Sequence, residues 1–173
     1  YKTVQYNLAT HPEWIITSVD LKNAYGTVLP ESVTKAVQSR LPKFAKYAQR
    51  VTATGSTGLW TDGSCWTHVI KQTRGVAQGD PLSTAFFAMV LATVIQETNG
   101  ILQEVNVDAQ ILTYADDPYI MSKPKDAERC IETFQQQLQK HGLTLHPDKT
   151  IVWCPQGETQ RAQLSTRLQP KVH

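Results

Sequence analysis

Two adjacent carboxylates, Asp116 and Asp117, constrain the fold of this chain more than any other feature. They follow an apolar run, Ile111 and Leu112, and precede another at 119–121. This pattern predicts a β-hairpin with the two acids at its tip. Like charges this close repel unless a cation lies between them, so a divalent metal is the usual reason for such a pair. The alternative is a polar turn, which is the commoner explanation for an isolated Asp-Asp.

The rest of the chain alternates between strand and helix patterns. Residues 14–21 and 150–154 are strand-like, and residues 52–68 indicate a loop or a short hairpin. Helices are expected at 30–41, at 43–51, at 82–98 with Asp80 as N-cap and Asn99-Gly100 as the end, and at 127–138 closed by Gly142. We therefore predict an α+β fold, with helices packed on one face of a mainly antiparallel sheet.

Composition bounds the function only loosely. A net charge of +2 and 18% charged residues permit nucleic-acid binding without arguing for it. Three cysteines with no CxxC pair indicate neither a disulfide framework nor a zinc site, so an intracellular, reducing compartment is expected, without a choice between nucleus, cytoplasm and organelle. No apolar run approaches 18 residues, and no membrane partner is expected. The chain begins with Tyr1 rather than Met, which suggests a fragment of a longer protein.

A third carboxylate gives the acid pair a chemical setting. Asp20 lies near the end of the strand pattern at 14–21, and the hairpin is expected in the same sheet. If these strands are neighbours, three carboxylates converge. Oxygen-only sites suit Mg²⁺ or Mn²⁺. Two such ions about 3.5–4 Å apart promote in-line phosphoryl displacement, so the acids indicate phosphoryl transfer.

Four segments resemble successive motifs of the reverse transcriptase palm and occur in the family's order. They are Asp20–Tyr25, Gly75–Ser83, Tyr114–Asp117, and Gly142-Leu143 with His146–Thr150. The Gln-Gly-Asp-Pro-Leu-Ser core of the second is similar to the branch of non-LTR retrotransposons and group II introns. The resemblance implies a palm with a ferredoxin-like or RRM-like core at 14–155, a remnant of the fingers at 1–13, and a polar tail at 156–173 that leads toward the thumb.

The resemblance also implies roles for residues at the acid site. Asp20 and Asp116 would be the main ligands of two Mg²⁺ ions (Mn²⁺ is an alternative), with Asp117 as the second acid of the pair. The backbone carbonyl of Leu21 would complete a metal shell. Lys149 matches the lysine that protonates the pyrophosphate leaving group, although a solvated lysine beside a Pro-Asp turn is an equal alternative.

Further residues are implied in binding the nucleotide and template. Tyr25 would pack against the sugar and disfavour a 2′-hydroxyl, unless it is a core aromatic at a strand end. Gln78 and Gly79 would contact the nucleotide and the template, although Gly79 could serve only the turn before a helix. Arg74, with Lys71, could meet phosphate, whereas most surface cations bind nothing specific.

Two departures from the family bear on function. Pro118 directly follows the acid pair and could bend or delay the second hairpin strand. The basic fingers and the thumb are essentially missing from these 173 residues. The preferred hypothesis is a nucleotidyltransferase palm from a longer RNA-directed DNA polymerase of a retrotransposon, acting on an RNA template, a primer and dNTPs, with fingers and thumb supplied by the rest of the parent or by partner subunits. The isolated chain is expected to have doubtful activity.

Two other functions compete with this hypothesis. One is a domesticated, catalytically inactive palm-like module that serves as an RNA-binding or scaffold subunit. The other is an RNA-templated RNA polymerase, which Ala115, in place of a glycine common there, and Tyr25 make less favourable.

Overall fold

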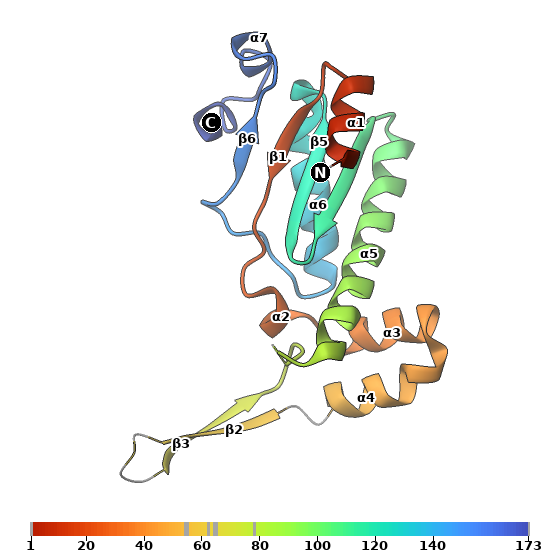
Figure 1. Ribbon diagram of the computed structural model, residues 1–173, viewed down its shortest axis with the longest axis vertical. Coiled ribbons are helices and arrows are strands. Elements are labelled where there is room, and N and C mark those ends of the chain that lie inside the picture. The colour runs from red at the N-terminus through yellow and green to blue at the C-terminus, as the bar shows by residue number, and fades with distance from the viewer. Residues whose placement is uncertain (1, 54–55, 62, 64–65, 78, 173) are drawn as a thin grey trace. The chain divides into compact units, whose positions relative to one another are not determined.

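The computed structural model describes residues 2–53, 56–61, 63, 66–77 and 79–172 (Figure 1). The chain divides into two compact units. Unit 1 comprises residues 1–22, 94–139 and 144–173, and unit 2 comprises residues 23–93 and 140–143. These units cut across the palm predicted at 14–155, whose boundaries stay a prediction.

Unit 1 is built on an antiparallel sheet. Its four strands lie in the order β4 (Ala109–Tyr114), β5 (Asp117–Ser122), β1 (Ile15–Ser18) and β6 (Ile151–Trp153). Every neighbouring pair is antiparallel. The predicted α+β fold is confirmed, and β1 and β5 lie at the centre of the sheet.

One face of the sheet is covered by α6 (Ala127–Lys140), as its apolar stripe predicted (Figure 1). Its buried side chains include Phe134 and Leu138, one turn apart. The thiol of Cys130 forms a hydrogen bond with Ser122 of β5, and burial raises the pKa of this thiol to about 11. The helix therefore packs on the side of the sheet to which Ser122 points.

The opposite face carries a second helix, α1 (Lys2–Thr10). The Asn7 side chain donates to Gln110 of β4 and contacts the Met121 sulfur of β5 at 3.7 Å. Since successive residues of a strand point to opposite faces, Met121 and Ser122 lie on opposite sides. The sheet is thus covered on both faces at this end, and Met121 and its neighbour Ile120 are both completely buried.

The segment after residue 155 is folded, although its sequence showed no pattern. It contains α7 (Glu158–Arg161) and the 3₁₀ turn η3 (Gln169–Lys171), and Val172 pairs with Val152 of β6. The Gln160 side chain is buried and donates to the carbonyl of Trp14 at 3.1 Å. A buried glutamine satisfied by backbone from a distant segment leaves no periodic signal in the sequence.

Unit 2 holds the helices expected at 30–41 and 43–51 and a hairpin where a loop or short hairpin was expected, together with the short helix α2, which the sequence did not predict. In chain order they are α2 (Ala24–Thr27), α3 (Pro30–Arg40), η1 (Pro42–Phe44), α4 (Ala45–Ala53), β2 (Ser56–Thr61) and β3 (Trp66–Gln72). The β2 and β3 strands pair only with each other, so of the two structures expected in this region the hairpin is the one formed. Pro30 and Pro42 each begin a helical turn, since a first-turn proline loses no helical hydrogen bond.

The apolar helix α5 (Pro81–Glu104) begins where the sequence predicted and ends later. Asp80 caps it, because its Oδ1 accepts a hydrogen bond from the Leu82 amide at 2.7 Å. The predicted end at Asn99-Gly100 is wrong. A glycine inside a helix costs only about 1 kcal/mol, and Leu102, buried one turn later, offsets that cost.

By length and composition, α5 could cross a membrane. An 18-residue window reaches a mean hydropathy of 1.4, and 39% of this window is buried inside the protein. The core helix of a soluble protein meets the same criterion, so the finding is weak evidence for a membrane span. The absence of a membrane partner stays a prediction.

A close backbone crossing within unit 2 depends on Gly75. The Gly75 amide donates to the Val28 carbonyl at 2.9 Å, and the Val76 amide donates to the Tyr25 carbonyl at 2.7 Å. Gly75 has a φ of +81°, and a Cβ there would lie 2.3 Å from the Tyr25 oxygen. Only glycine allows both the conformation and the approach.

We expect Gly75→Ala to destabilise the protein by about 2–3 kcal/mol, because the methyl group adds a backbone clash to the cost of a left-handed alanine. Gly79→Ala is the matched control, since Gly79 has a φ of +94° but open space where the methyl group of an alanine would lie. This control should cost only about 1–2 kcal/mol. Urea unfolding of both variants measures the difference, and equal losses would contradict the proposed clash.

Candidate functional site

Strand pairing brings Asp20 level with Asp117. In the β1–β5 ladder Ser18 lies opposite Tyr119, and the Val19 amide then donates to the Pro118 carbonyl at 3.1 Å. Continued to the start of β5, this register sets Asp20 opposite Asp117. Residues opposite in an antiparallel pair point to the same face, so the two carboxylates are cross-strand neighbours.

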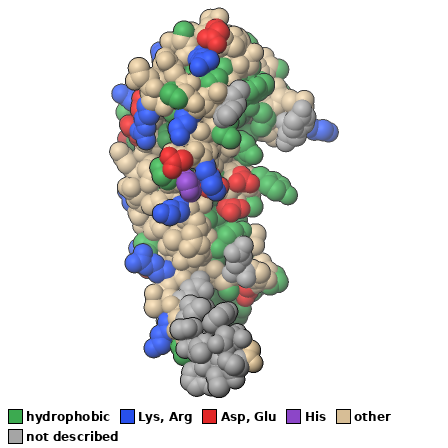
Figure 2. Space-filling view, turned by 90° about the vertical axis from the view of Figure 1, so that its left-hand side faces the viewer, with side chains coloured by type: hydrophobic (Ala, Val, Ile, Leu, Met, Phe, Trp, Pro, Cys, Tyr) green, Lys and Arg blue, Asp and Glu red, His purple; other side chains and the backbone are tan. Residues whose placement is uncertain are grey.

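These two acids line an open groove in unit 1 of about 1030 Å³. The groove also receives Asp148, Lys149 and Lys171. Figure 2 shows the face that lies on the left in Figure 1, and at its mid-height acidic side chains flank basic ones. Neither Asp148 nor Lys171 was proposed from the sequence. Asp148 adjoins Lys149 in the fourth motif, which was a usable signal, whereas Lys171 lies in the segment that showed no pattern.

Lys149 forms an ion pair with Asp20. Its Nζ lies 3.0 Å from Asp20 Oδ2, with the two side chains 59% and 34% exposed. An ion pair this open to solvent adds little to stability, about 0–1 kcal/mol. Its importance is positional, because it holds a cation beside the acid pair. The role of Lys149 at a leaving group stays a prediction.

Backbone pairing places Lys149 there. The Lys22 amide donates to the Thr144 carbonyl at 2.9 Å, and the His146 amide donates to the Asp20 carbonyl at 2.7 Å. Leu21 pairs with Leu145 between these two bonds and is buried. The segment before Lys149 is therefore fixed along the segment that carries Asp20. The role of the Leu21 carbonyl in a metal shell stays a prediction.

The two hairpin acids occupy different positions. Asp117 is the first residue of β5 and pairs with Tyr114, so the turn consists of Ala115 and Asp116. Asp117 is exposed and Asp116 half-buried. Among the described residues that line the groove, Asp117 is present and Asp116 is not. The structure thus joins Asp20 with Asp117, and the role of Asp116 as a main ligand stays a prediction.

Pro118 does not delay the second hairpin strand. β5 begins at Asp117, and the Pro118 carbonyl accepts the bond from Val19 that aligns β1 with β5. Proline lacks an amide donor but keeps its carbonyl acceptor. The departure from the family at this position therefore leaves the pairing of Asp20 with Asp117 intact.

The groove suits a hard divalent cation by its donor chemistry. Asp20 and Asp117 supply carboxylate oxygens, which Mg²⁺ and Mn²⁺ prefer, and the open groove leaves room for water and phosphate ligands. Among the described residues, no group of three or more His, Cys, Asp and Glu side chains is arranged to hold a metal ion. The predicted set of Asp20, Asp116 and Asp117 is thus not assembled as a three-acid cluster. The cation that contacts Asp20 is the Lys149 ammonium.

The residues predicted to bind nucleotide and template belong to unit 2. The Tyr25 ring is half-buried and packs on Phe87, with centroids 4.8 Å apart. Gly79 has a φ of +94°, so its turn requires glycine irrespective of any ligand. Arg74 is exposed. Gln78 lies outside the described residues. These roles stay predictions.

Fold and site together define a polymerase palm, with paired acids on an antiparallel sheet. The family model of reverse transcriptase (RNA-dependent DNA polymerase) matches residues 2–167. The chain therefore belongs to the reverse transcriptase family, as the four motifs predicted.

A curated relative agrees with the predicted branch. The chain is 27% identical over 162 residues to the retrovirus-related Pol polyprotein from type-1 retrotransposable element R2 of Nasonia vitripennis. R2 is a non-LTR retrotransposon. The match covers 87% of this chain but 15% of the relative, so the chain spans a small part of the protein it resembles.

Solved structures with a similar fold include yeast telomerases. Apo telomerase from Candida tropicalis, truncated from the C-terminal domain, matches with a TM-score of 0.64 and 18% identity, over 87% of this chain and 33% of that one. Telomerase from Candida albicans, in complex with a fragment of telomeric RNA, matches with a TM-score of 0.58 and 14% identity, over 86% and 29% of the two chains. At these identities the likeness shows the fold alone.

The hairpin turn stores strain that a substitution can release. Ala115 has a φ of +54°, which costs an alanine about 1–2 kcal/mol. We expect Ala115→Gly to raise the free energy of unfolding by about 0–1 kcal/mol. The strain that the substitution relieves exceeds the extra conformational entropy that a glycine has in the unfolded chain. Ala162→Gly is the control, since Ala162 has a φ of −62° and should lose about 0.5–1 kcal/mol. Urea unfolding checks both, and equal losses would contradict the turn geometry.

Proposed function

We propose that this chain is the catalytic palm of an RNA-directed DNA polymerase, which in a longer parent protein transfers nucleotides onto a primer 3′-hydroxyl. The observation that carries the proposal is the grouping of Asp20, Asp117 and Lys149 in one open groove, with Lys149 3.0 Å from Asp20. Carboxylates beside a lysine on an accessible surface suit a reaction of phosphates.

Asp20 and Asp117, with Asp116 from the adjoining turn, would hold the divalent ions. Bound there, Mg²⁺ or Mn²⁺ would activate the primer hydroxyl and offset the negative charge of the reacting phosphate. The protein's own contribution is to fix the carboxylates on paired strands, so that little reorganisation is needed when the substrates arrive. The Leu21 carbonyl would add a neutral oxygen ligand.

Lys149 would act on the leaving group. An ammonium in this groove can neutralise pyrophosphate or donate a proton to it. Its ion pair with Asp20 keeps it beside the reacting groups while the groove is without substrate. As an exposed side chain on a long stem, it can turn to a phosphate without moving the backbone.

Residues of unit 2 would bind the other reactants. Tyr25 would contact the sugar of a dNTP, and Gln78 and Gly79 would contact the nucleotide and the template. Arg74 would meet a phosphate. An RNA template, a primer and dNTPs are thus the proposed partners, with fingers and thumb supplied by the parent or by partner subunits. An intracellular location is proposed with them.

A second candidate is a domesticated palm that no longer catalyses and instead binds RNA or organises a larger assembly. One observation favours it, because no three-acid metal cluster is assembled among the described residues. The two proposals differ in whether the acids bind a metal and whether the parent extends a primer.

In the full-length parent, we expect Asp117→Asn and Asp116→Asn each to abolish extension of a DNA primer on an RNA template with Mg²⁺, by at least about a hundredfold. The reason is loss of a metal ligand. Asp108→Asn, at an exposed acid just before β4, is the control and should extend as the unchanged protein does. Primer extension by Asp116→Asn at the unchanged rate would overturn the assignment.

Metal binding can be tested without catalysis. If the groove binds Mg²⁺, a concentration one hundred times the dissociation constant raises the free energy of unfolding by about 2.7 kcal/mol. Asp20→Asn should remove most of this stabilisation, whereas Asp108→Asn should retain it. Thermal unfolding of the 173-residue chain with and without Mg²⁺ measures the effect. An equal response of the Asp20→Asn variant would refute a metal at this groove.

A further inference from the structure

The two units carry opposite net charges, which the overall value of +2 conceals. Unit 2 contains eight Lys and Arg against three Asp and Glu, a formal charge of +5. Unit 1 contains nine against twelve, a formal charge of −3. Such an asymmetry points to a polyanionic partner for the basic part. The acid groove lies in unit 1, so unit 2 must present a different surface to such a partner.

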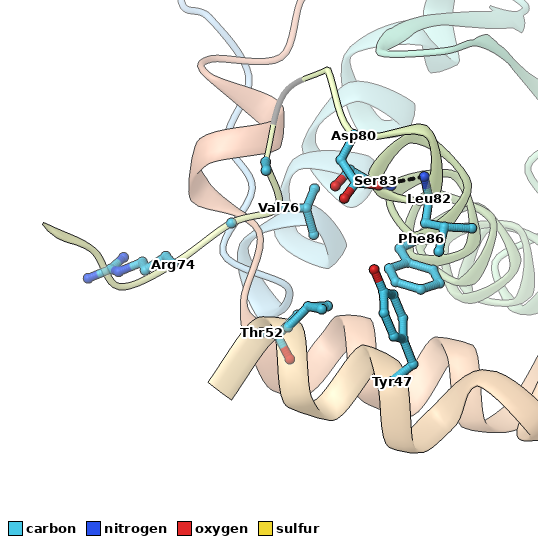
Figure 3. A pocket seen from close by; sticks show the side chains of 11 residues that line it. Tyr47, Thr52, Arg74, Val76, Asp80, Leu82, Ser83 and Phe86 are labelled. Atoms are coloured by element: carbon cyan, nitrogen blue, oxygen red, sulfur yellow. Dashed lines mark hydrogen bonds between the residues drawn. The ribbon is translucent and has the colours of Figure 1, made fainter. Parts of the chain in front are cut away.

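Unit 2 contains a small hollow between α4, the turn 74–77 and the start of α5; we name it the α4–α5 pocket (Figure 3). Val76 and Phe86 are buried and form its apolar floor. Tyr47 and Val51 of α4 are 43% and 42% exposed and form one wall. Its apolar floor suits a flat ring.

Tyr47 offers that ring a stacking surface. It rises from α4 beside Phe86, with the ring centroids 6.3 Å apart and the rings inclined by 57° (Figure 3). Tyr47 is 43% exposed, so part of its side chain remains accessible to a ligand beside Phe86. Aromatic faces of this kind bind unpaired bases whatever their sequence.

Asp80 supplies a polar group at the same pocket. Its Oδ1 accepts hydrogen bonds from the amides of Leu82 and Ser83, at 2.7 and 3.4 Å. Among the described residues, Oδ2 has no partner, and the carboxylate turns toward the hollow (Figure 3). A carboxylate oxygen accepts a hydrogen bond from the exocyclic amino group of a base such as cytosine.

Basic residues lie on both sides of Tyr47 along the chain, and one basic residue lines the pocket. Lys43 and Arg50 lie one helical turn before and after Tyr47, and both are exposed. Arg74 stands at the rim. Cations on both sides of an exposed aromatic ring are the arrangement that binds the backbone and a base of a single strand together.

We propose that the α4–α5 pocket binds one unpaired base of single-stranded RNA, stacked on Tyr47 and hydrogen-bonded through its amino group to Asp80, with the flanking phosphates on Lys43, Arg50 and Arg74. This inference deepens the proposed function, since the RNA would be the template strand of the parent. It is tested by binding without metal, so that its failure and the failure of catalysis are separate results.

The test measures fluorescence anisotropy of labelled C12 and U12 RNA with the 173-residue chain in EDTA. We expect C12 to bind about fivefold more tightly than U12 or better, because uracil lacks the amino group. Tyr47→Ala should weaken C12 binding by about tenfold or more, whereas Tyr47→Phe retains the ring and should bind normally. Tyr6→Ala, at an exposed tyrosine of α1, is the matched control and should change nothing.

Two further variants test the polar contacts. Asp80→Asn preserves the helix cap, since asparagine caps as well as aspartate, but should abolish the preference for C12. The double variant Lys43→Gln, Arg50→Gln should reduce the slope of log affinity against log salt by about 1.4. Thermal unfolding confirms that each variant is folded.

Three outcomes would overturn the proposal. They are no binding of either RNA to the unchanged chain, normal C12 binding by a folded Tyr47→Ala variant, and an unchanged C12 preference in Asp80→Asn. A further result would also overturn it. If free CMP displaced labelled C12 as effectively as unlabelled C12 does at the same concentration, the pocket would serve a mononucleotide rather than a strand. Absence of RNA binding would leave the pocket to a protein partner.

Discussion

The pairing of β1 with β5 is the constraint on which the rest of the site depends. The bond from the Val19 amide to the Pro118 carbonyl sets Asp20 opposite Asp117. A slip of one residue would turn every side chain of a strand to the other face. A slip would break the contact of Met121 with Asn7 on one face and the hydrogen bond of Ser122 with Cys130 on the other. Contacts at one end of the sheet thus position the charges at the other.

Charges positioned in this way create a demand for a cation. Two carboxylates opposite each other repel, and Lys149 partly offsets the repulsion through its contact with Asp20. The same ammonium would be displaced or redirected when a divalent ion and a phosphate enter. Because the pair is exposed, its separation costs little, about 0–1 kcal/mol. A weak ion pair therefore suits a site whose cation must change partners.

Sequence reasoning reached the elements whose signals are local. Asp80 caps α5 as predicted, and the apolar stripe of α6 marked its buried face. The position where α5 ends could not be predicted, since the packing of Leu102 outweighs the helix-breaking tendency of Asn99-Gly100. The burial of Gln160 depends on backbone from the other end of the chain. The acids were found from their motifs, whereas which acid shares the groove with Asp20 depends on strand register.

The opposite charges of the two units agree with a division of labour within one chemistry. Nucleotidyl transfer needs negative groups to hold metal ions and positive groups to hold phosphates. Carboxylates and cations a few ångströms apart pair with each other, as Asp20 and Lys149 do, so cations kept away from the acids are more available to phosphates. Division between two units lets each present mainly one sign of charge. The small net charge of the whole chain is thus the sum of two larger local charges, and it is the local charges that a nucleic acid meets.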